Sequence, residues 1–199
     1  METTSSLIIG INRRDNHWMT GFHWACNKGY LDVVKILMEN AAALSIDLNA
    51  TSPAGMTAFH MACYEGHSNV VKFFMESVSS FSFDLKRKDS NGWAGFHWAC
   101  QSGKSDVLKL FMENASALNI DFDATTKLGV TAFQMACQGS TSDVIKILME
   151  NASAFRIDLN KKDKSDKTNT CNLYTFLRVS QFPMYIFAVY STRTITTHL

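Results

Sequence analysis

The sequence predicts an all-α solenoid in which helix–turn–helix units stack in a single row. Two observations lead to this prediction. A seven-residue phrase recurs four times at a constant spacing of 37 residues, and each copy lies in the same pattern of helix-like and turn-like segments. One helix pair of this size cannot bury its own apolar face, so neighbouring units must stack to form a core.

The recurring phrase sets the boundaries of the units. It reads TGFHWAC, TAFHMAC, AGFHWAC and TAFQMAC, beginning at Thr20, Thr57, Ala94 and Thr131. Flanking positions keep the same register, so we predict repeats at 15–51, 52–88, 89–125 and 126–162. An N-terminal extension (1–14) precedes them. The opening of a truncated fifth repeat (163–168) and a non-repeat tail (169–199) follow.

Within a unit, the elements can be assigned in order, here for the second one. Thr57 is a suitable N-cap for the first helix, and Gly66 is a suitable stop. Ser68 is then predicted to cap a second helix with one apolar face. Gly55 and Gly92 mark a tight turn in the loop before each first helix, where a positive φ favours glycine.

These residues resemble the ankyrin repeat, and the third unit carries most of its signature in Asp89, Gly92 and Phe96-His97-Trp98-Ala99. The second unit adds Gly66-His67 and Val70-Val71. Gly or Ala stands where the signature has Pro, and Phe stands where it has Leu. The resemblance implies a non-enzymatic module, an adaptor or scaffold, that binds another protein through the concave face of the stack.

The period is four residues longer than the family's usual 33, and the addition follows Glu39 in the first unit. Four residues make about one helical turn. We therefore predict an outer helix that is lengthened by one turn. Its extra apolar positions would form a ladder of Leu44, Phe81, Leu118 and Phe155.

His–Cys pairs at helical spacing raise the question of metal binding or nucleophilic catalysis. They are His23–Cys26, His60–Cys63 and His97–Cys100. A zinc site needs about four converging ligands, whereas stacking places each pair in a different layer. The fourth unit has Gln134 in place of the histidine. The resemblance implies that this histidine hydrogen-bonds within the repeat, and a free cysteine here behaves as a small buried hydrophobe. We predict no metal, no cofactor and no catalytic site.

One helix position holds either Trp or Met in every unit: Trp24, Met61, Trp98 and Met135. An aromatic and methionine stripe suits a ligand surface as well as a core. Its place beside the recurring His and Ala favours packing between repeats. Lys35, Glu39 and their equivalents are predicted to form the solvated face of the outer helix.

The candidate binding residues are those that differ between units at the loop tips and at the ends of the first helices. They are Met19, Asn27, Met56, Tyr64, Glu65, Asn91, Trp93, Gln101, Val130 and Gln138. Four of them follow the turn glycine position and predict an apolar line along the concave face: Met19, Met56, Trp93 and Val130. Trp and Tyr are frequent anchors of interfaces. The alternative for Trp93 is that its ring folds back on a neighbour.

Composition narrows the class of partner and the location. Apolar residues make up 46% of the chain, and the net charge is +1 without a concentrated basic run, which argues against binding to nucleic acid. The first ten residues lack the basic and apolar regions of a secretory signal, so we expect an intracellular protein, cytoplasmic or nuclear. The apolar stretch Phe182–Tyr190 is short for a membrane span. For the tail the sequence favours a cap over the fourth repeat. The alternatives are a truncated array whose tail has no settled structure, and a membrane anchor.

Overall fold

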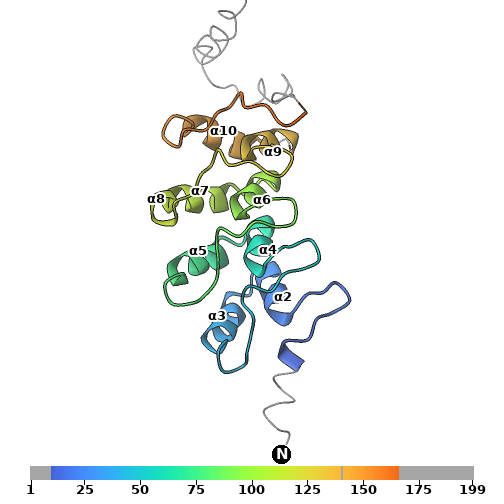
Figure 1. The fold of residues 1–199 in the computed structure, drawn as a ribbon. Coiled ribbons are helices and arrows are strands. Elements are labelled where there is room, and N and C mark those ends of the chain that lie inside the picture. Colours follow the sequence, from blue (N-terminus) through green and yellow to red (C-terminus); the bar gives the residue numbers. More distant parts are fainter. Residues whose placement is uncertain (1–9, 140, 166–199) are drawn as a thin grey trace, which may run out of the picture.

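A computed structural model describes residues 10–139 and 141–165, which form an elongated stack of four layers (Figure 1). Each layer holds an inner and an outer helix. The inner helices are α2 (Gly21–Asn27), α4 (Ala58–Glu65), α6 (Gly95–Gln101) and α9 (Ala132–Gln138). The outer helices are α3 (Leu31–Glu39), α5 (Ser68–Ser77), α7 (Ser105–Glu113) and α10 (Ser142–Glu150).

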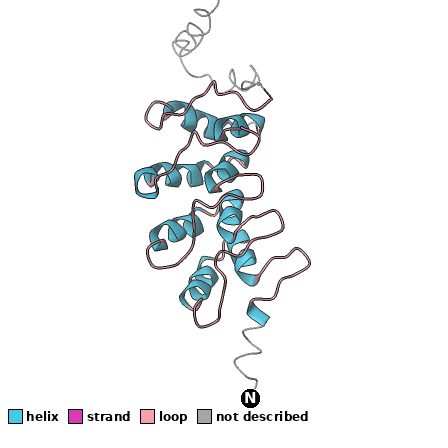
Figure 2. Cartoon of the chain, viewed as in Figure 1, coloured by secondary structure: helices cyan, strands magenta, loops and turns pink. Residues whose placement is uncertain are grey.

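The layers follow one another in chain order. Each inner helix packs on the inner helix of the next layer, and each outer helix packs on the next outer helix. Long loops join the layers (Figure 2), and in the described part of the chain the β-type pairing is confined to isolated bridges between Thr51 and Thr57 and between Thr125 and Thr131. The predicted all-α solenoid of stacked helix pairs is confirmed.

Aromatic rings connect the layers into one core. Phe74, which is 1% exposed, lies between Phe22 of the first layer and Phe59 of its own layer, with ring centroids 6.0 and 5.4 Å away. The ring contacts continue towards the C-terminal end through Phe111, Phe96, Phe122 and Phe155. The solenoid is therefore held by a continuous core that no single layer could build alone.

The inner helices begin as predicted in three of the four layers. The Thr57 hydroxyl accepts from the backbone N–H of His60 at 3.4 Å, and Thr20 and Thr131 make the same cap. Ala94 occupies this position in the third layer, so α6 begins without a side-chain cap.

The predicted cap of the second helix is wrong. Ser68 is the first residue of α5, and His67 precedes it without making a side-chain cap. The ring of His67 instead extends to the previous layer, where its Nε2 donates to the carbonyl of Asn27 at 2.8 Å. The turn before the outer helix therefore connects two repeats instead of only starting a helix.

The four extra residues form the predicted turn, but not as a continuation of the outer helix. The side-chain amides of Asn40, Asn114 and Asn151 each donate to the carbonyl four residues earlier, at 2.8 Å, and the outer helix ends there. A separate turn follows, which in the third layer is the short helix α8 (Ala115–Leu118). The predicted apolar ladder is half-buried at all four positions. In the second layer Ser77 holds the asparagine position and the outer helix ends there as well, so the amide contact accompanies the break in three layers and is not needed for it.

Backbone hydrogen bonds tie the loops of successive layers together. The N–H groups of Ser90, Lys127 and Lys164 donate to the carbonyls of Ala54, Asn91 and Leu128, at 2.9–3.0 Å. Gly55 and Gly92 have the predicted positive φ, at 76° and 81°. A Cβ on Gly55 would lie 2.6 Å from the Ser90 nitrogen, so the close approach of two loops also requires glycine there.

The two ends of the chain lie partly beyond the described residues. Residues 1–9 of the predicted extension, Ser140, residues 166–168 of the predicted fifth repeat and the tail 169–199, with every role predicted for it, fall outside them. Near the N-terminal end, Asn12 donates to the carbonyl of Leu44 at 2.9 Å and so attaches the extension to the first layer. Within residues 10–139 and 141–165, none of the helices has the length and apolar character that crossing a membrane requires.

Candidate partner-binding face

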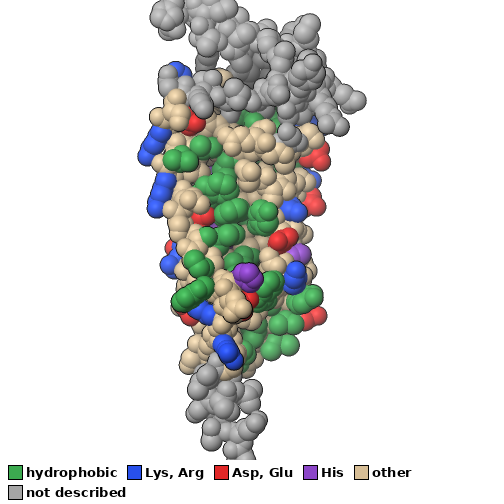
Figure 3. Space-filling view, turned by 90° about the vertical axis from the view of Figure 1, so that its right-hand side faces the viewer, with side chains coloured by type: hydrophobic (Ala, Val, Ile, Leu, Met, Phe, Trp, Pro, Cys, Tyr) green, Lys and Arg blue, Asp and Glu red, His purple; other side chains and the backbone are tan. Residues whose placement is uncertain are grey.

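The tips of the loops and the adjoining sides of the inner helices form one surface, which we call the inner face. It comprises the loops 14–19, 51–56, 88–93 and 125–130 with the exposed positions of α2, α4, α6 and α9. These loops lie together on the right-hand side of the stack in Figure 1. Figure 3 views this side and shows apolar side chains along the length of the stack.

All ten candidate binding residues belong to the inner face, but they differ in exposure. Tyr64, Glu65, Asn91 and Gln138 are exposed, whereas Asn27, Met56, Trp93, Gln101 and Val130 are half-buried and Met19 is buried. Two of them interact across the first and second layers, because the Asn27 amide donates to the Glu65 carboxylate at 3.1 Å. The structure thus brings the candidates onto one surface, and their role in binding stays a prediction.

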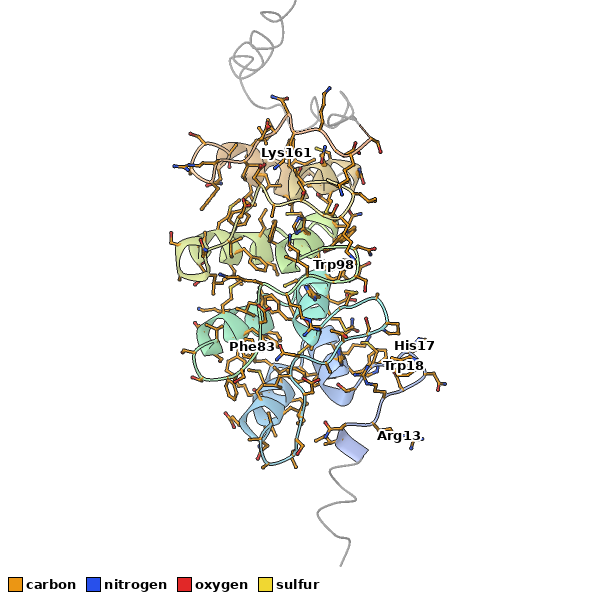
Figure 4. All side chains as sticks on the ribbon, in the orientation of Figure 1. Arg13, His17, Trp18, Phe83, Trp98 and Lys161 are labelled. Carbon is orange, nitrogen blue, oxygen red and sulfur yellow. The ribbon has the colours of Figure 1, made fainter. Side chains whose placement is uncertain are left out.

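An aromatic cluster of Tyr64, Trp93 and Trp98 lies at the middle of the inner face. The Trp93 ring packs on Trp98 with centroids 4.4 Å apart, and Tyr64 meets Trp98 edge-on at 5.5 Å. Figure 4 labels Trp98 in the third layer, well away from Trp18 and His17 at the N-terminal loop. Trp93 therefore folds back on a neighbour, as the alternative prediction stated, while part of its ring stays accessible.

The prediction that the Trp and Met stripe packs between repeats is wrong for Trp24, which is 39% exposed. Met61 and Met135 are buried, and the half-buried Trp98 packs against the core and on Tyr64 of the preceding repeat. A flexible methionine can fold into the space between layers, whereas a rigid indole at the same position extends over the surface. Sequence reasoning therefore missed two residues of the inner face, Trp24 and Trp98.

A helical spacing could have identified both of these tryptophans. Trp24 precedes Asn27 by three residues, and Trp98 precedes Gln101 by three. Residues three apart lie on the same side of a helix. Since Asn27 and Gln101 were already assigned to the binding surface, the same side of each helix had to include the indole.

Aspartate residues shape two of the loop tips. Asp89 accepts from the backbone N–H groups of Asn91 and Trp93 through Oδ1, at 2.8 Å each. Asp15 does the same for the loop of the first layer, where the N–H of Met19 is 2.9 Å away. The hydrogen bond from Met19 is the main reason that the pKa of the Asp15 carboxyl lies below its ordinary value.

Buried histidines hold the loops in place beneath the inner face. In the second layer His60 Nδ1 accepts from the backbone N–H of Thr57 at 3.0 Å, and Nε2 donates to the carbonyl of Arg87 at 2.9 Å. This pattern assigns the neutral tautomer with its proton on Nε2. His23 and His97 make the equivalent bonds in their layers. Burial lowers the pKa of all three, and that of His97 to about 4.

Gln134 shows what the histidine position requires. Its Oε1 accepts from the backbone N–H of Thr131 at 2.7 Å, and its Nε2 donates to the carbonyl of Lys161 at 2.8 Å. The amide thus makes the same acceptor and donor bonds as the neutral imidazole. Because both ring nitrogens are used in this way, the histidines join the first helix of a repeat to the loop that follows its second helix.

The cysteine partners of these histidines belong to the core. Cys26, Cys63 and Cys100 are 0% exposed, and burial raises the pKa of each thiol. A thiol with a raised pKa is a poor nucleophile and a poor metal ligand at neutral pH. In the part of the chain that the structure describes, no three His, Cys, Asp or Glu side chains come together in a way that could hold a metal ion.

Comparison with known families identifies the repeat. The model for ankyrin repeats (three copies) matches residues 2–81, 22–126 and 76–163 in three overlapping alignments. Together these matches span more than half of the chain and include all four layers. A search of the curated proteins finds no match to the chain.

Proposed function

The chain belongs to the ankyrin-repeat family, and we propose that it is an adaptor that binds one partner protein through the inner face. Ankyrin repeats are in general modules for interactions between proteins. The observation that supports the inner face is the aromatic cluster of Tyr64, Trp93 and Trp98, since large rings at the centre of an accessible surface are typical binding anchors.

The variation between layers also supports this surface. Loop tips and helix ends of the inner face carry different side chains in each layer, while the residues that hold the frame recur. Specific recognition needs such a pattern, because an identical surface in every layer would offer no distinct register to a partner. The exposed side chains Asn91 and Gln138 would add hydrogen bonds at the rim.

We propose a binding role and not catalysis. A cavity of about 270 Å³ lies between the segments 85–88 and 119–124, lined by apolar residues such as Phe96, Phe111 and Leu118. Its ionisable lining residues are Lys86, Lys88 and Asp121, which do not form an acid, base and nucleophile set. The net charge of +1 agrees with a protein partner rather than nucleic acid, and we propose an intracellular, cytoplasmic or nuclear location.

A capture experiment with matched variants tests the inner face. Proteins bound by the wild-type chain would be identified from cell extract, and each would be titrated against purified variants. The double variant Tyr64→Ala with Trp93→Ala should weaken binding of the specific partner by about 2 kcal/mol, which is a roughly 30-fold increase in the dissociation constant.

The control lies on the outer helices. Lys72 and Glu76 form an exposed ion pair at 3.8 Å on α5, so Lys72→Ala with Glu76→Ala removes surface charge without touching the inner face. This variant should bind as the wild type does. Equal weakening by both variants, or weakening only by the outer one, would place the site elsewhere.

A further inference from the structure

Two buried polar atoms beneath the aromatic cluster have no hydrogen-bond partner. They are Oδ2 of Asp89 and Nε1 of Trp98, and they are the only such side-chain atoms in the described residues. Asp89 is 5% exposed, so its second carboxylate oxygen is removed from water without compensation. An acceptor and a donor left unpaired in the same layer are each unfavourable, and each would gain from pairing with the other.

In the first layer the equivalent aspartate and tryptophan are joined by a hydrogen bond. Trp24 Nε1 donates to Asp15 Oδ2 at 2.8 Å. Asp15 and Asp89 hold their loops through the same Oδ1 contacts, to the N–H groups two and four residues later. The second and fourth layers have Ser52 and Thr126 at the aspartate position and Met61 and Met135 at the tryptophan position. Aspartate and tryptophan thus occur together in this chain.

The first and third layers differ at several loop positions, and one of these places a second indole against the tryptophan in the third layer. Met19 occupies this position in the first layer and Trp93 in the third. The Trp93 ring packs on Trp98 with centroids 4.4 Å apart and planes inclined by 49°. Trp98 is also in edge contact with Tyr64 of the second layer. The indole of Trp98 is therefore held by ring contacts in a position where its N–H does not reach Asp89.

We propose that Trp93 is a releasable anchor, whose ring leaves Trp98 on binding, enters an apolar cavity of the partner and allows Trp98 Nε1 to donate to Asp89 Oδ2. The proposal rests on the proposed function of the inner face and names the kind of surface that fits it. A partner with an apolar cavity of indole size replaces the ring contact that Trp93 gives up. The new hydrogen bond satisfies both buried atoms, as it already does in the first layer.

The intramolecular half of the proposal is tested without any partner. In Trp93→Met the position carries the residue of the first and second layers. Nuclear magnetic resonance of the indole N–H groups should then show the Trp98 signal moved downfield to the region of Trp24, with slower exchange against deuterium. Adding Asp89→Asn should reverse both changes, because the asparagine presents an NH₂ group where Oδ2 was while its oxygen still serves the loop. A Trp98 signal that does not move in Trp93→Met overturns the proposal.

The release of the ring is tested on the wild-type chain with β-cyclodextrin, a soluble host with an apolar cavity. The Trp93 signal should shift with host concentration, and the Trp98 N–H should move along the path seen in Trp93→Met. The exposed Trp18 serves as the internal control for simple host binding. Shifts confined to Trp18, or a Trp93 shift without a Trp98 response, overturn the release step. Neither experiment uses the natural partner, so its failure leaves the proposed function of the inner face to be judged by the capture experiment.

Discussion

At the scale of single residues, the histidine of each repeat is a neutral hydrogen-bonding device. His23, His60 and His97 accept a backbone N–H on Nδ1 and donate from Nε2 to a carbonyl 27 residues later. Protonation would place a second N–H against the backbone donor and add a charge to a buried site. The folded state therefore binds protons less readily than the unfolded chain, which explains the lowered pKa values.

This arrangement predicts that acid weakens the fold through these histidines. Since their folded pKa values lie below 6.5, their contribution is complete above about pH 6.5 and decreases as the pH falls towards 4, the folded pKa of His97. At pH 5, the lowered pKa of His97 alone should reduce the free energy of unfolding by about 2 kcal/mol. Urea denaturation at pH 7 and pH 5 measures the loss.

Gln134 supplies the matched variant for that measurement. Replacing all three residues, as His23→Gln, His60→Gln and His97→Gln, retains an acceptor and a donor but removes the titration. The difference in stability between pH 7 and pH 5 should become smaller than in the wild type. An identical pH dependence in the triple variant would show that other groups cause the loss.

At the scale of elements, the loop of the first layer departs from the other loops. Trp18 has a φ of 61° at the position where later layers have glycine. Pro53 stands where Ser90 and Lys127 donate an N–H to the preceding loop in later layers. Proline has no N–H to donate. Arg14 instead donates to the carbonyl of Thr51 at 2.8 Å, so a side chain joins these two layers.

A glycine in the first loop should therefore stabilise the protein. Trp18→Gly relieves a left-handed backbone, and after the entropy cost of glycine the gain should be roughly 0.5–1 kcal/mol in thermal denaturation. Gly92→Ala is the opposite control, because its φ is 81° and a Cβ would lie 2.9 Å from the Lys127 nitrogen. It should destabilise. A less stable Trp18→Gly would mean that the contact of Arg14 with the Trp18 ring, 5.9 Å apart, outweighs the strain.

At the scale of the whole molecule, stability depends on contacts between adjacent layers. Phe74 makes several of these contacts, because its ring touches those of Phe22, Phe59 and Phe83. In a solenoid each layer touches only its neighbours, so a cavity at one junction weakens the coupling across that junction first.

Removing this ring should make the two ends of the stack unfold more independently of each other. Phe74→Ala is expected to cost about 3–5 kcal/mol. Hydrogen exchange should accelerate most in α2 and α3, while α9 and α10 keep more of their protection. Tyr30→Ala is the control, since Tyr30 is 61% exposed and its loss should change stability by no more than about 0.5 kcal/mol. Equal acceleration in all layers would argue that the array unfolds as one indivisible unit.

The repeat itself was readable from the sequence because its signal is local and recurs. A constant period, Thr57 at a helix start and Gly55 at a turn each follow from the preferences of a few adjacent residues. Four copies in register then require stacking, because no copy can bury its own apolar face. The same local patterns placed the ten candidate binding residues on one surface.

Interactions between layers could not be predicted from such local sequence patterns. The prediction for Ser68 was wrong because His67 bonds to Asn27 of the preceding layer, 40 residues away in the sequence. The sequence predicted one lengthened outer helix, whereas the helix ends near the asparagine position in every layer and a separate turn follows. Trp98 packs between repeats as predicted, but its contacts with Tyr64 and Trp93 leave it half-buried on the inner face, which the sequence did not indicate.

The sequence by itself determined the fold, and it predicted the repeat boundaries and the strip of the molecule on which candidate binding residues lie. Only the tertiary structure decided which large side chains are accessible and which polar atoms are paired. Asp15 and Asp89 occupy equivalent positions, yet only the carboxylate of Asp15 bonds to its tryptophan. The reason is physical: exposure and hydrogen-bond pairing depend on neighbours in adjacent loops and layers, and these neighbours differ between the first and third layers, with Met19 in one and Trp93 in the other.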